Sequence, residues 1–360
     1  MTDENYNDGV LPAQAIAALM DNGAISGADS ARLQPASLDL TLGPRAWRVR
    51  ASFLPSKKKT VKDRLNDGLA MQAMDLSDGA VFERGCVYLV ELNEQLQLPD
   101  NVKGAANPKS STGRIDVFVR LVTDHGAAFD EIPAGYEGPL YAEISPRTFS
   151  ILARSGSSLN QLRLKAGRYR LDDAALEKLH QSSALVEGSA DISGGLGLSV
   201  SLARDDGMIG WRARRHSALI DVDKVAALDP NEYFEPITAP SAGFIILDPD
   251  EFYILASKEA LCVPPDYAAE MTPISPGLGE FRVHYAGFFD PGFGWAETGI
   301  NGSRGVLEVR SHDAPFVLED GQLVARLVYE KMSARPEQLY GADLKSNYQG
   351  QGLKLSKHFR

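Results

Sequence analysis

The chain has 360 residues, of which 44% are hydrophobic and 24% are charged, totals that exclude a disordered chain and correspond to about two globular domains. The formal net charge of −11 disfavours general nucleic-acid binding, so a bound anion requires a local cluster of donors or a metal ion. The sequence shows no 18-residue apolar run, no signal peptide and no disulfide framework, and we therefore expect a cytoplasmic protein that does not enter a membrane.

The first predicted elements are a short helix and then strands. Residues 12–20 place Pro12 in a first helical turn, show an apolar face and are followed by a glycine that can end the helix. Residues 34–43 alternate like a strand that enters a turn, whereas the four lysines of residues 53–66 indicate an exposed loop. From Ala80 onward, short apolar runs are broken at close spacing by Gly, Pro, Asn and Asp. This pattern predicts a mainly β protein, built as a barrel or a sandwich of short strands.

The first candidate site is the cluster Lys-Ser-Ser-Thr-Gly-Arg at residues 109–114, which follows a strand-like run and a turn. It combines short hydroxyl donors, two cations and a glycine, and its arginine can bind two oxygens at once. These groups, with backbone N–H groups exposed by a turn, are what a polyphosphate requires. A plain turn between strands has a similar composition, so both interpretations stay open at this point.

A second copy of the surrounding sequence lies 165 residues further along the chain. At this offset Tyr88 corresponds to Tyr253, and Glu143 corresponds to Glu308. Further matched pairs are Leu96 and Leu261, Pro99 and Pro264, Gly156 and Gly321, and Leu162 and Leu327. One offset shared by such distant pairs indicates a tandem duplication of a β-rich unit. We therefore expect a first unit over residues 1–168 and a second unit over residues 169–360.

The two copies differ in the groups that could carry chemistry. At the offset of the anion cluster, residues 274–279 have lost both cations and include a proline, which has no N–H to donate. Conversely, the second copy has an acidic turn, Asp-Pro-Gly at residues 290–292, whose counterpart in residues 132–137 lacks the aspartate. The simplest interpretation is one composite site to which both copies contribute.

Taken together, these motifs resemble the dCTP deaminases and the related trimeric dUTPases. The cluster at residues 109–114 is similar to their Arg-Ser-Ser-x-x-Arg phosphate motif, and residues 34–43 are similar to the opening strand of the deaminases. Residues 286–292 and 305–309 resemble their nucleoside motif, which ends in the catalytic glutamate. Residues 340–352 resemble their C-terminal lid, usually Lys-Tyr-Gln-x-Gln. By this resemblance the chain is a tandem-duplicated long form of the superfamily.

The resemblance implies two tandem dUTPase-like β-barrels of the distorted jelly-roll type, with a few short helices. It implies a hydrolase that acts on the cyclic amidine of dCTP and forms dUTP and ammonia, with dTTP as an inhibitor and a homo-oligomeric assembly. A triphosphate bound to an acidic protein should bring Mg²⁺, coordinated mostly by phosphate oxygens and water. The substrate-binding residues would be Lys109, Ser110, Ser111, Arg114, Tyr340, Lys345, Tyr348, Gln349 and Gln351.

The proposed catalytic base is Glu308, which would activate water at cytosine C4 and deliver a proton to N3. It lies in the apolar run Val306-Leu307-Glu308-Val309, although strand alternation would also permit a solvent-facing glutamate. By the resemblance, Ala286 helps to hold the catalytic water, and Asp290 contacts the sugar or fixes the turn. Glu143 is the rival for Glu308, but it lacks an acidic turn beside it.

Three alternatives can be compared with the sequence. A zinc deaminase would need a His-x-Glu motif and a Pro-Cys-x-x-Cys motif; neither is present, so we expect no zinc site. A dUTPase, or a bifunctional enzyme that also cleaves the triphosphate, would share the fold. A non-catalytic nucleotide-binding regulator is the third, because duplicated copies often decay. The chain also departs from the family pattern, with Lys109 for the first arginine of the phosphate motif and Asn347 for the lid lysine.

Overall fold

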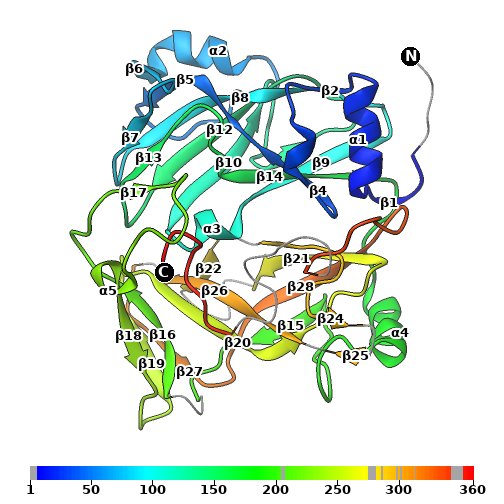
Figure 1. The fold of residues 1–360 in the computed structure, drawn as a ribbon, viewed down its shortest axis with the longest axis vertical. Coiled ribbons are helices and arrows are strands. Elements are labelled where there is room, and N and C mark those ends of the chain that lie inside the picture. Colours follow the sequence, from blue (N-terminus) through cyan, green and yellow to red (C-terminus); the bar gives the residue numbers. More distant parts are fainter. Residues whose placement is uncertain are drawn as a thin grey trace. The chain divides into compact units, whose positions relative to one another are not determined.

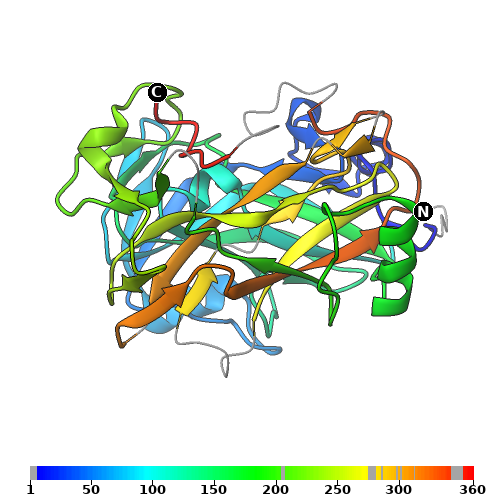
Figure 2. The ribbon, with the colours of Figure 1, turned by 90° about the horizontal axis from the view of Figure 1, so that it is seen from below.

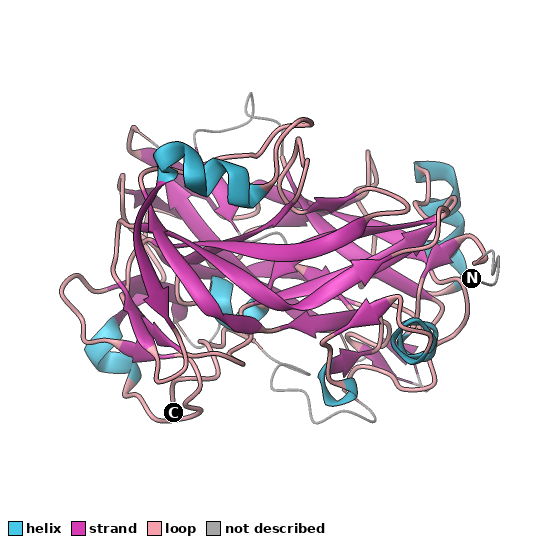
Figure 3. Cartoon of the chain, turned by 90° about the horizontal axis from the view of Figure 1, so that it is seen from above, coloured by secondary structure: helices cyan, strands magenta, loops and turns pink. Residues whose placement is uncertain are grey.

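The protein is described here by a computed structural model of the 360-residue chain. The structure describes residues 6–203, 207–274, 281–284, 287–296, 299–300, 302–311, 313–341 and 352–360. Strands dominate these residues and the helices are few and short, as Figure 3 shows. The predicted mainly β class is therefore confirmed. No helix within the described ranges has the length and apolar character needed to cross a membrane.

The chain forms two compact units. Unit 1 comprises residues 1–169, 218–227 and 332–337, and unit 2 comprises residues 170–217, 228–331 and 338–360. The helices (Figure 1) are α1 (Ala13–Asp21), α2 (Val61–Arg64) and α3 (Ser110–Gly113) in unit 1, and α4 (Asp173–Ser182) and α5 (Pro230–Tyr233) in unit 2. The helix predicted over residues 12–20 is α1, which buries Ile16 and Leu19.

Three sheets build unit 1. The first has the order β11-β9-β14-β4-β3, with β1 also paired to β14; the second has the order β10-β12-β8-β5-β6, with β2 paired to β8; the third has the order β17-β13-β7. Their bounds are β1 (Gly9–Val10), β2 (Ile25–Ser26), β3 (Leu33–Gln34), β4 (Ser37–Leu40), β5 (Leu42–Val49), β6 (Ala70–Asp75), β7 (Ala80–Phe82), β8 (Val87–Gln97), β9 (Val102–Pro108), β10 (Val117–Thr123), β11 (Glu131–Ile132), β12 (Glu137–Pro146), β13 (Ile151–Ala153), β14 (Asn160–Ala166) and β17 (Ile220–Asp221).

Unit 2 contains sheets with the orders β15-β28-β21-β23, β18-β16-β20-β26-β22, β19-β27 and β24-β25. Their bounds are β15 (Leu196–Ser199), β16 (Met208–Ala213), β18 (Phe234–Thr238), β19 (Phe244–Leu247), β20 (Tyr253–Leu261), β21 (Tyr267–Pro273), β22 (Phe281–His284), β23 (Phe288–Phe289), β24 (Trp295–Ala296), β25 (Gly299–Ile300), β26 (Ser303–Ser311), β27 (Phe316–Glu319) and β28 (Leu323–Lys331). Buried leucines, valines and aromatic residues of these strands and of α4 form its core.

The strand orders of the two units correspond. The path β11-β9-β14-β4 of unit 1 matches β23-β21-β28-β15 of unit 2, and β10-β12-β8-β5-β6 matches β22-β26-β20-β16-β18. The pair β7 and β13 matches the pair β19 and β27. The central strands also agree in position, because β9 and β21 lie 165 residues apart at both ends. The repeat seen in the sequence is therefore a repeat of sheet topology.

Matched side chains perform matched structural tasks in the two units. The hydroxyl of Tyr88 accepts a hydrogen bond of 3.0 Å from the backbone N–H of Glu83, and the hydroxyl of Tyr253 accepts one of 3.0 Å from Asp248. Both rings are buried, at 2% and 3% exposure. Burial also raises the pKa of both phenols above the ordinary value. Each tyrosine thus fixes the loop that precedes its own strand.

A second repeated device is a glutamate that clamps the end of a neighbouring strand. The Glu94 carboxylate accepts hydrogen bonds from the backbone N–H of Thr41 at 3.0 and 3.1 Å and from its hydroxyl at 2.7 Å. Glu259 accepts in the same way from the N–H and hydroxyl of Ser199, at 2.9 and 2.5 Å. Burial raises the pKa of Glu94, which the Thr41 donors partly offset. The buried Glu94 carboxylate is therefore satisfied, as a buried carboxylate requires.

The loop predicted over residues 53–66 is partly wrong, because it contains α2. Thr60 caps this helix: its hydroxyl accepts from the N–H of Asp63 at 3.1 Å, and the Asp63 carboxylate accepts from the N–H of Thr60 at 2.8 Å. Val61 is fully buried. The Thr-x-x-Asp capping box is visible in the sequence, but the prediction considered only the neighbouring lysines.

Two segments from the second half of the sequence belong to unit 1. Strand β17 pairs in parallel with β13, and Arg154 bonds the Asp221 carboxylate at 2.8 and 3.0 Å, which lowers the pKa of Asp221. Further along, the N–H of Ser333 donates to the carbonyl of Val10 at 2.9 Å. Unit 1 is therefore completed by chain that lies far beyond residue 169.

This arrangement predicts that a fragment of residues 1–168 will be unstable by itself. The fragment lacks Ile220 and Val222, which are 0% and 5% exposed. Burying each such side chain contributes about 1.5–3 kcal/mol, against a typical total stability of about 5–15 kcal/mol. We expect the thermal unfolding midpoint of the fragment to fall far below that of unit 1 in the whole chain. A peptide of residues 216–229 should raise this midpoint, and a fragment as stable as the whole chain would contradict the prediction.

Candidate functional site

The predicted anion cluster forms a single helical turn at the end of β9. The N–H of Lys109 donates to the carbonyl of Leu159 at 2.9 Å, and the Lys109 carbonyl then accepts from the N–H groups of Thr112 and Gly113 at 2.8 and 3.0 Å. This turn is α3, which leads directly into β10 through the buried Arg114. The structure therefore brings Lys109, Ser110, Ser111 and Arg114 together between two strands of unit 1. Ser110 is exposed, whereas Ser111 is 5% exposed.

A carboxylate that the sequence interpretation did not select lies against this cluster. Asp39, on β4, forms an ion pair with the ammonium group of Lys109, and the two side chains are 8% and 20% exposed. The available signal was the aspartate in the otherwise apolar run Leu38-Asp39-Leu40. Strand alternation places it on the face opposite its two leucine neighbours.

The acidic turn of unit 2 is tightly fixed. The carbonyl of Asp290 accepts from the N–H of Phe293 at 3.1 Å, and the N–H of Gly292 donates to the carbonyl of Val263 at 3.0 Å. Gly292 has a φ of +98°, and an added Cβ would lie 3.0 Å from the carbonyl oxygen of Tyr340. This position therefore requires glycine for both conformation and space. Asp290 itself is 8% exposed.

Tyr340, at the start of the predicted lid, packs on this turn. Its N–H donates to the carbonyl of Pro291 at 2.9 Å, and its ring centroid lies 5.8 Å from that of Phe293. The last residues of the chain are also held within unit 2: Phe359 forms a parallel bridge with Leu228. Figure 2 shows this red C-terminal segment beside the green segment that carries α5.

Glu308 lies on β26, between β20 and β22. It is opposite Ile254 on one side and His284 on the other, and its side chain is 4% exposed. The alternative of a solvent-facing strand glutamate is therefore wrong. Its burial on an interior strand is compatible with the predicted role.

Glu143 occupies the matching place in unit 1, opposite Leu89 and Arg120. Here the carboxylate has a cationic partner, because Arg120 Nη2 lies 2.5 Å from Glu143 Oε1. The Arg120 guanidinium also donates to the hydroxyl of Ser52 at 2.8 Å and lies 3.8 Å from the ring centroid of Phe129. Arg120 is the residue paired with Glu143 on the neighbouring strand of unit 1, and His284 is the residue paired with Glu308 on the neighbouring strand of unit 2. The two glutamates thus share a backbone position and differ in the residue opposite.

The structure therefore places the predicted residues that it describes in two groups. One consists of Lys109, Ser110, Ser111 and Arg114 in unit 1, and the other consists of Asp290, Glu308 and Tyr340 in unit 2. Five further predicted site residues lie outside the described residues: Ala286, Lys345, Tyr348, Gln349 and Gln351.

Among the described residues, no group of three or more His, Cys, Asp or Glu side chains is placed to hold a metal ion. Cys262 is 3% exposed, and burial raises the pKa of its thiol to about 11. A thiol with such a pKa is a poor source of the thiolate that metal coordination requires.

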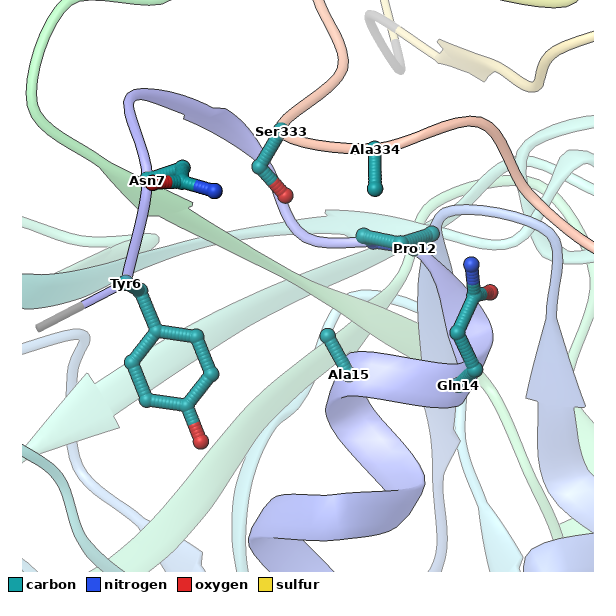
Figure 4. A pocket seen from close by; sticks show the side chains of 7 residues that line it. All are labelled: Tyr6, Asn7, Pro12, Gln14, Ala15, Ser333 and Ala334. Carbon is teal, nitrogen blue, oxygen red and sulfur yellow. The ribbon is translucent and has the colours of Figure 1, made fainter. Parts of the chain in front are cut away.

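Unit 1 has a pocket of about 370 Å³ whose described lining includes none of the predicted site residues. It is lined by Tyr6, Asn7, Pro12, Gln14, Ala15, Ser333 and Ala334 (Figure 4). Its lining contains no charged side chain, so it does not suit a triphosphate.

Two family models match most of the chain. Residues 7–168 match the model of the 2'-deoxycytidine 5'-triphosphate deaminase N-terminal domain, and residues 172–359 match the model of the C-terminal domain. A crystal structure of 2'-deoxycytidine 5'-triphosphate deaminase from Agrobacterium tumefaciens superimposes with a TM-score of 0.89 at 53% identity, covering 94% of this chain and 99% of that one. The described fold is accordingly dUTPase-like.

Shorter relatives match part of the chain. A protein of Beutenbergia cavernae named "dCTP deaminase, dUMP-forming" is 32% identical over 39% of this chain and 73% of its own length. One of Kocuria rhizophila with the same name is 33% identical over the same shares of both chains. The chain belongs to the 2'-deoxycytidine 5'-triphosphate deaminase family.

Proposed function

We propose that the chain catalyses the hydrolytic deamination of dCTP to dUTP and ammonia, without zinc. The observation that carries this proposal is Glu308, a carboxylate buried on an interior strand of the unit that also holds the fixed Asp290 turn. Membership of the deaminase family supports the same reaction. The assay is incubation with dCTP, followed by measurement of ammonia and dUTP. Absence of both products from folded protein would overturn the proposal.

The reaction needs a nucleophilic water at C4, a proton at N3 and ammonia as leaving group. In the proposed mechanism, Glu308 takes the proton from the water as it attacks C4 and passes that proton to N3 of the cytosine. The proton of the new C4 hydroxyl is then transferred to the amino group, the C4–N bond breaks, and ammonia leaves as the C4 carbonyl of uracil forms. Low exposure of Glu308 keeps bulk water from its carboxylate. Asp290 contacts the sugar or holds the turn, and Ala286 helps to position the water.

The triphosphate is bound by a different set of groups. We propose that Arg114 and Lys109 pair with its charges while the hydroxyls of Ser110 and Ser111 donate to its oxygens. Tyr340, Lys345, Tyr348, Gln349 and Gln351 complete the binding of the substrate as the C-terminal lid. Mg²⁺ bound to the phosphate oxygens and to water would supply charge neutralisation there. Lys109 and Arg114, which flank α3, and the hydroxyls of α3 offer cations and donors for the phosphates.

The chain also fits an origin by tandem duplication. Corresponding strand orders, the paired tyrosines and the paired glutamate clamps support this inference. In this arrangement unit 1 holds the anion cluster, and its glutamate pairs with Arg120. Unit 2 kept the acidic turn and the glutamate that we assign as the base. By family resemblance, the proposal includes a cytoplasmic homo-oligomer that dTTP inhibits.

A second candidate function is bifunctional conversion of dCTP to dUMP. Two relatives carry the name "dCTP deaminase, dUMP-forming". The two functions give different nucleotides, dUTP or dUMP, and only the cleavage of dUTP to dUMP releases pyrophosphate. Pyrophosphate formed in step with ammonia would select the bifunctional enzyme, and dUTP accumulating without pyrophosphate would select the simple deaminase.

Metal removal gives a prediction for the same assay. Activity should survive a zinc-selective chelator and should fall when Mg²⁺ is removed, because the metal accompanies the phosphates and does not generate the nucleophile. The measurement is the rate of ammonia release in the two media, with metal content determined on the purified protein. Stoichiometric zinc that is lost together with activity would contradict the prediction.

A further inference from the structure

The ion pair between Asp39 and Lys109 is the feature of the anion cluster that the proposed function does not use. Its carboxylate comes from β4 and its ammonium comes from the residue that precedes α3, so it joins two elements 70 residues apart in sequence. The carboxylate side chain is 8% exposed and the lysine side chain is 20% exposed. The pair is thus anchored at its acidic end and open to solvent at its basic end.

Asp39 is held in place by a sheet. In the register of β4, β14 and β9, Asp39 lies opposite Gln161, and Gln161 lies opposite Asn107. The Gln161 carboxamide oxygen also accepts from the hydroxyl of Ser37 at 3.5 Å. The aspartate therefore stands in a row of polar residues across three paired strands, which leaves its carboxylate few positions to occupy.

Lysine contributes a point charge on a flexible stem. The conformational entropy lost when a lysine side chain is ordered is among the largest of all residue types. An ammonium group has three N–H donors, so Asp39 can use one and leave the others for phosphate oxygens. We propose that Asp39 is a positioning residue, which holds the ammonium group of Lys109 beside Ser110, Ser111 and Arg114 in readiness for the triphosphate.

Comparison of the two units supports this assignment. In unit 1, Asn160 lies opposite Leu40 on one side and Pro108 on the other. In unit 2, Ala325 lies opposite Leu198 and Pro273 in the same way. These registers align the two sheets residue by residue. In that alignment the place of Asp39 is taken by Gly197 and that of Lys109 by Ile274. The pair is absent from the unit that lacks the anion cluster.

The proposal rests on the proposed function, because it assumes that the cluster binds the triphosphate of dCTP. Asp39→Asn keeps the size of the side chain and removes its charge. We expect this variant to bind dCTP about tenfold more weakly, which corresponds to the entropy of ordering one lysine side chain. Binding of deoxycytidine, which has no phosphate, should not change. Calorimetric titration of both ligands measures this difference.

A double-mutant cycle then tests whether Asp39 acts through Lys109. In a Lys109→Met background, Asp39→Asn should have no further effect on dCTP binding, because the group to be positioned is gone. An equal loss in both backgrounds would show that Asp39 has a separate structural role. Tighter dCTP binding by Asp39→Asn would show that the carboxylate competes with the phosphates for Lys109. Either result would overturn the proposal.

A matched control exists in the same unit. Asp67 pairs with Lys59 at 2.5 Å, away from the cluster, so Asp67→Asn repeats the substitution at another Lys–Asp pair and should leave dCTP binding unchanged. If Asp39→Asn does not fold, Asp39→Glu replaces it, because glutamate keeps the charge and displaces the ammonium group. Asp39→Glu should give a smaller loss of dCTP affinity, and this loss should vanish in the Lys109→Met background.

Titration with inorganic tripolyphosphate separates the two proposals. A chain that does not deaminate dCTP, yet binds tripolyphosphate in an Asp39-dependent way, fails only the proposed function.

Discussion

Replacement of Glu308 by glutamine is expected to remove deamination while dCTP binding stays close to that of the unchanged chain. The substitution keeps the shape of the buried side chain and removes its capacity to accept a proton from water. Loss of a general base lowers the rate by about 10²-fold or more. The measurement is kcat from ammonia release, with the dissociation constant of dCTP determined separately by calorimetry. A decrease in kcat at unchanged affinity identifies a group that acts on the reaction and not on ground-state binding.

Glu143→Gln provides the matched control at the same place in unit 1. Deamination should be nearly unaffected, because the Glu143 carboxylate is engaged by Arg120 at 2.5 Å and has no acidic turn beside it. The free energy of unfolding should fall by about 1–3 kcal/mol, since Arg120 loses a charged partner. Reversed effects, with Glu143→Gln inactive and Glu308→Gln active, would show that the catalytic roles of the two units are exchanged.

Sequence periodicity was sufficient for those features that depend on neighbours in the chain. The apolar run around Glu308 correctly indicated a strand, and the shared offset anticipated that β9 and β21 are equivalent. The turn at residues 109–114 was also identified, because Ser, Thr and Gly are residues that form turns wherever they occur. The lysines near Thr60 favoured an exposed loop, but the structure has a short helix there with a capping box formed by Thr60 and Asp63.

Features that depend on distant pairing could not be obtained in this way. Asp39 meets Lys109 across 70 residues, and Arg120 meets Glu143 only because β10 and β12 pair in one particular register. A shift of one residue would place Arg120 on the opposite face of the sheet from Glu143. The addition of β17 to unit 1 is likewise a property of tertiary structure, since nothing in residues 218–227 marks them as part of the first unit.

Replacement of Arg114 by alanine is expected to weaken dCTP binding by on the order of 10²-fold or more. A guanidinium that binds a phosphate with two N–H donors forms two charge-assisted hydrogen bonds of about 1.5–3 kcal/mol each. Deoxycytidine lacks the phosphates, so its binding should change far less. The dissociation constants of both ligands, measured on the same protein preparations, give the ratio that tests the assignment. Arg114→Lys should recover part of the dCTP affinity, because lysine restores the charge without the two-pronged geometry.

The ratio of the two affinities separates a phosphate contact from a structural role. Arg114 is 3% exposed, so its truncation also removes buried packing and should lower the unfolding temperature. That loss affects both ligands equally, whereas a phosphate contact affects dCTP alone. Arg154→Ala is the matched control, because Arg154 pairs with Asp221 in the same unit and outside the anion cluster. It should lower stability without changing the ratio. Equal losses of dCTP and deoxycytidine binding in Arg114→Ala would make Arg114 a structural residue, and the phosphates would then depend on Lys109 and the two serines.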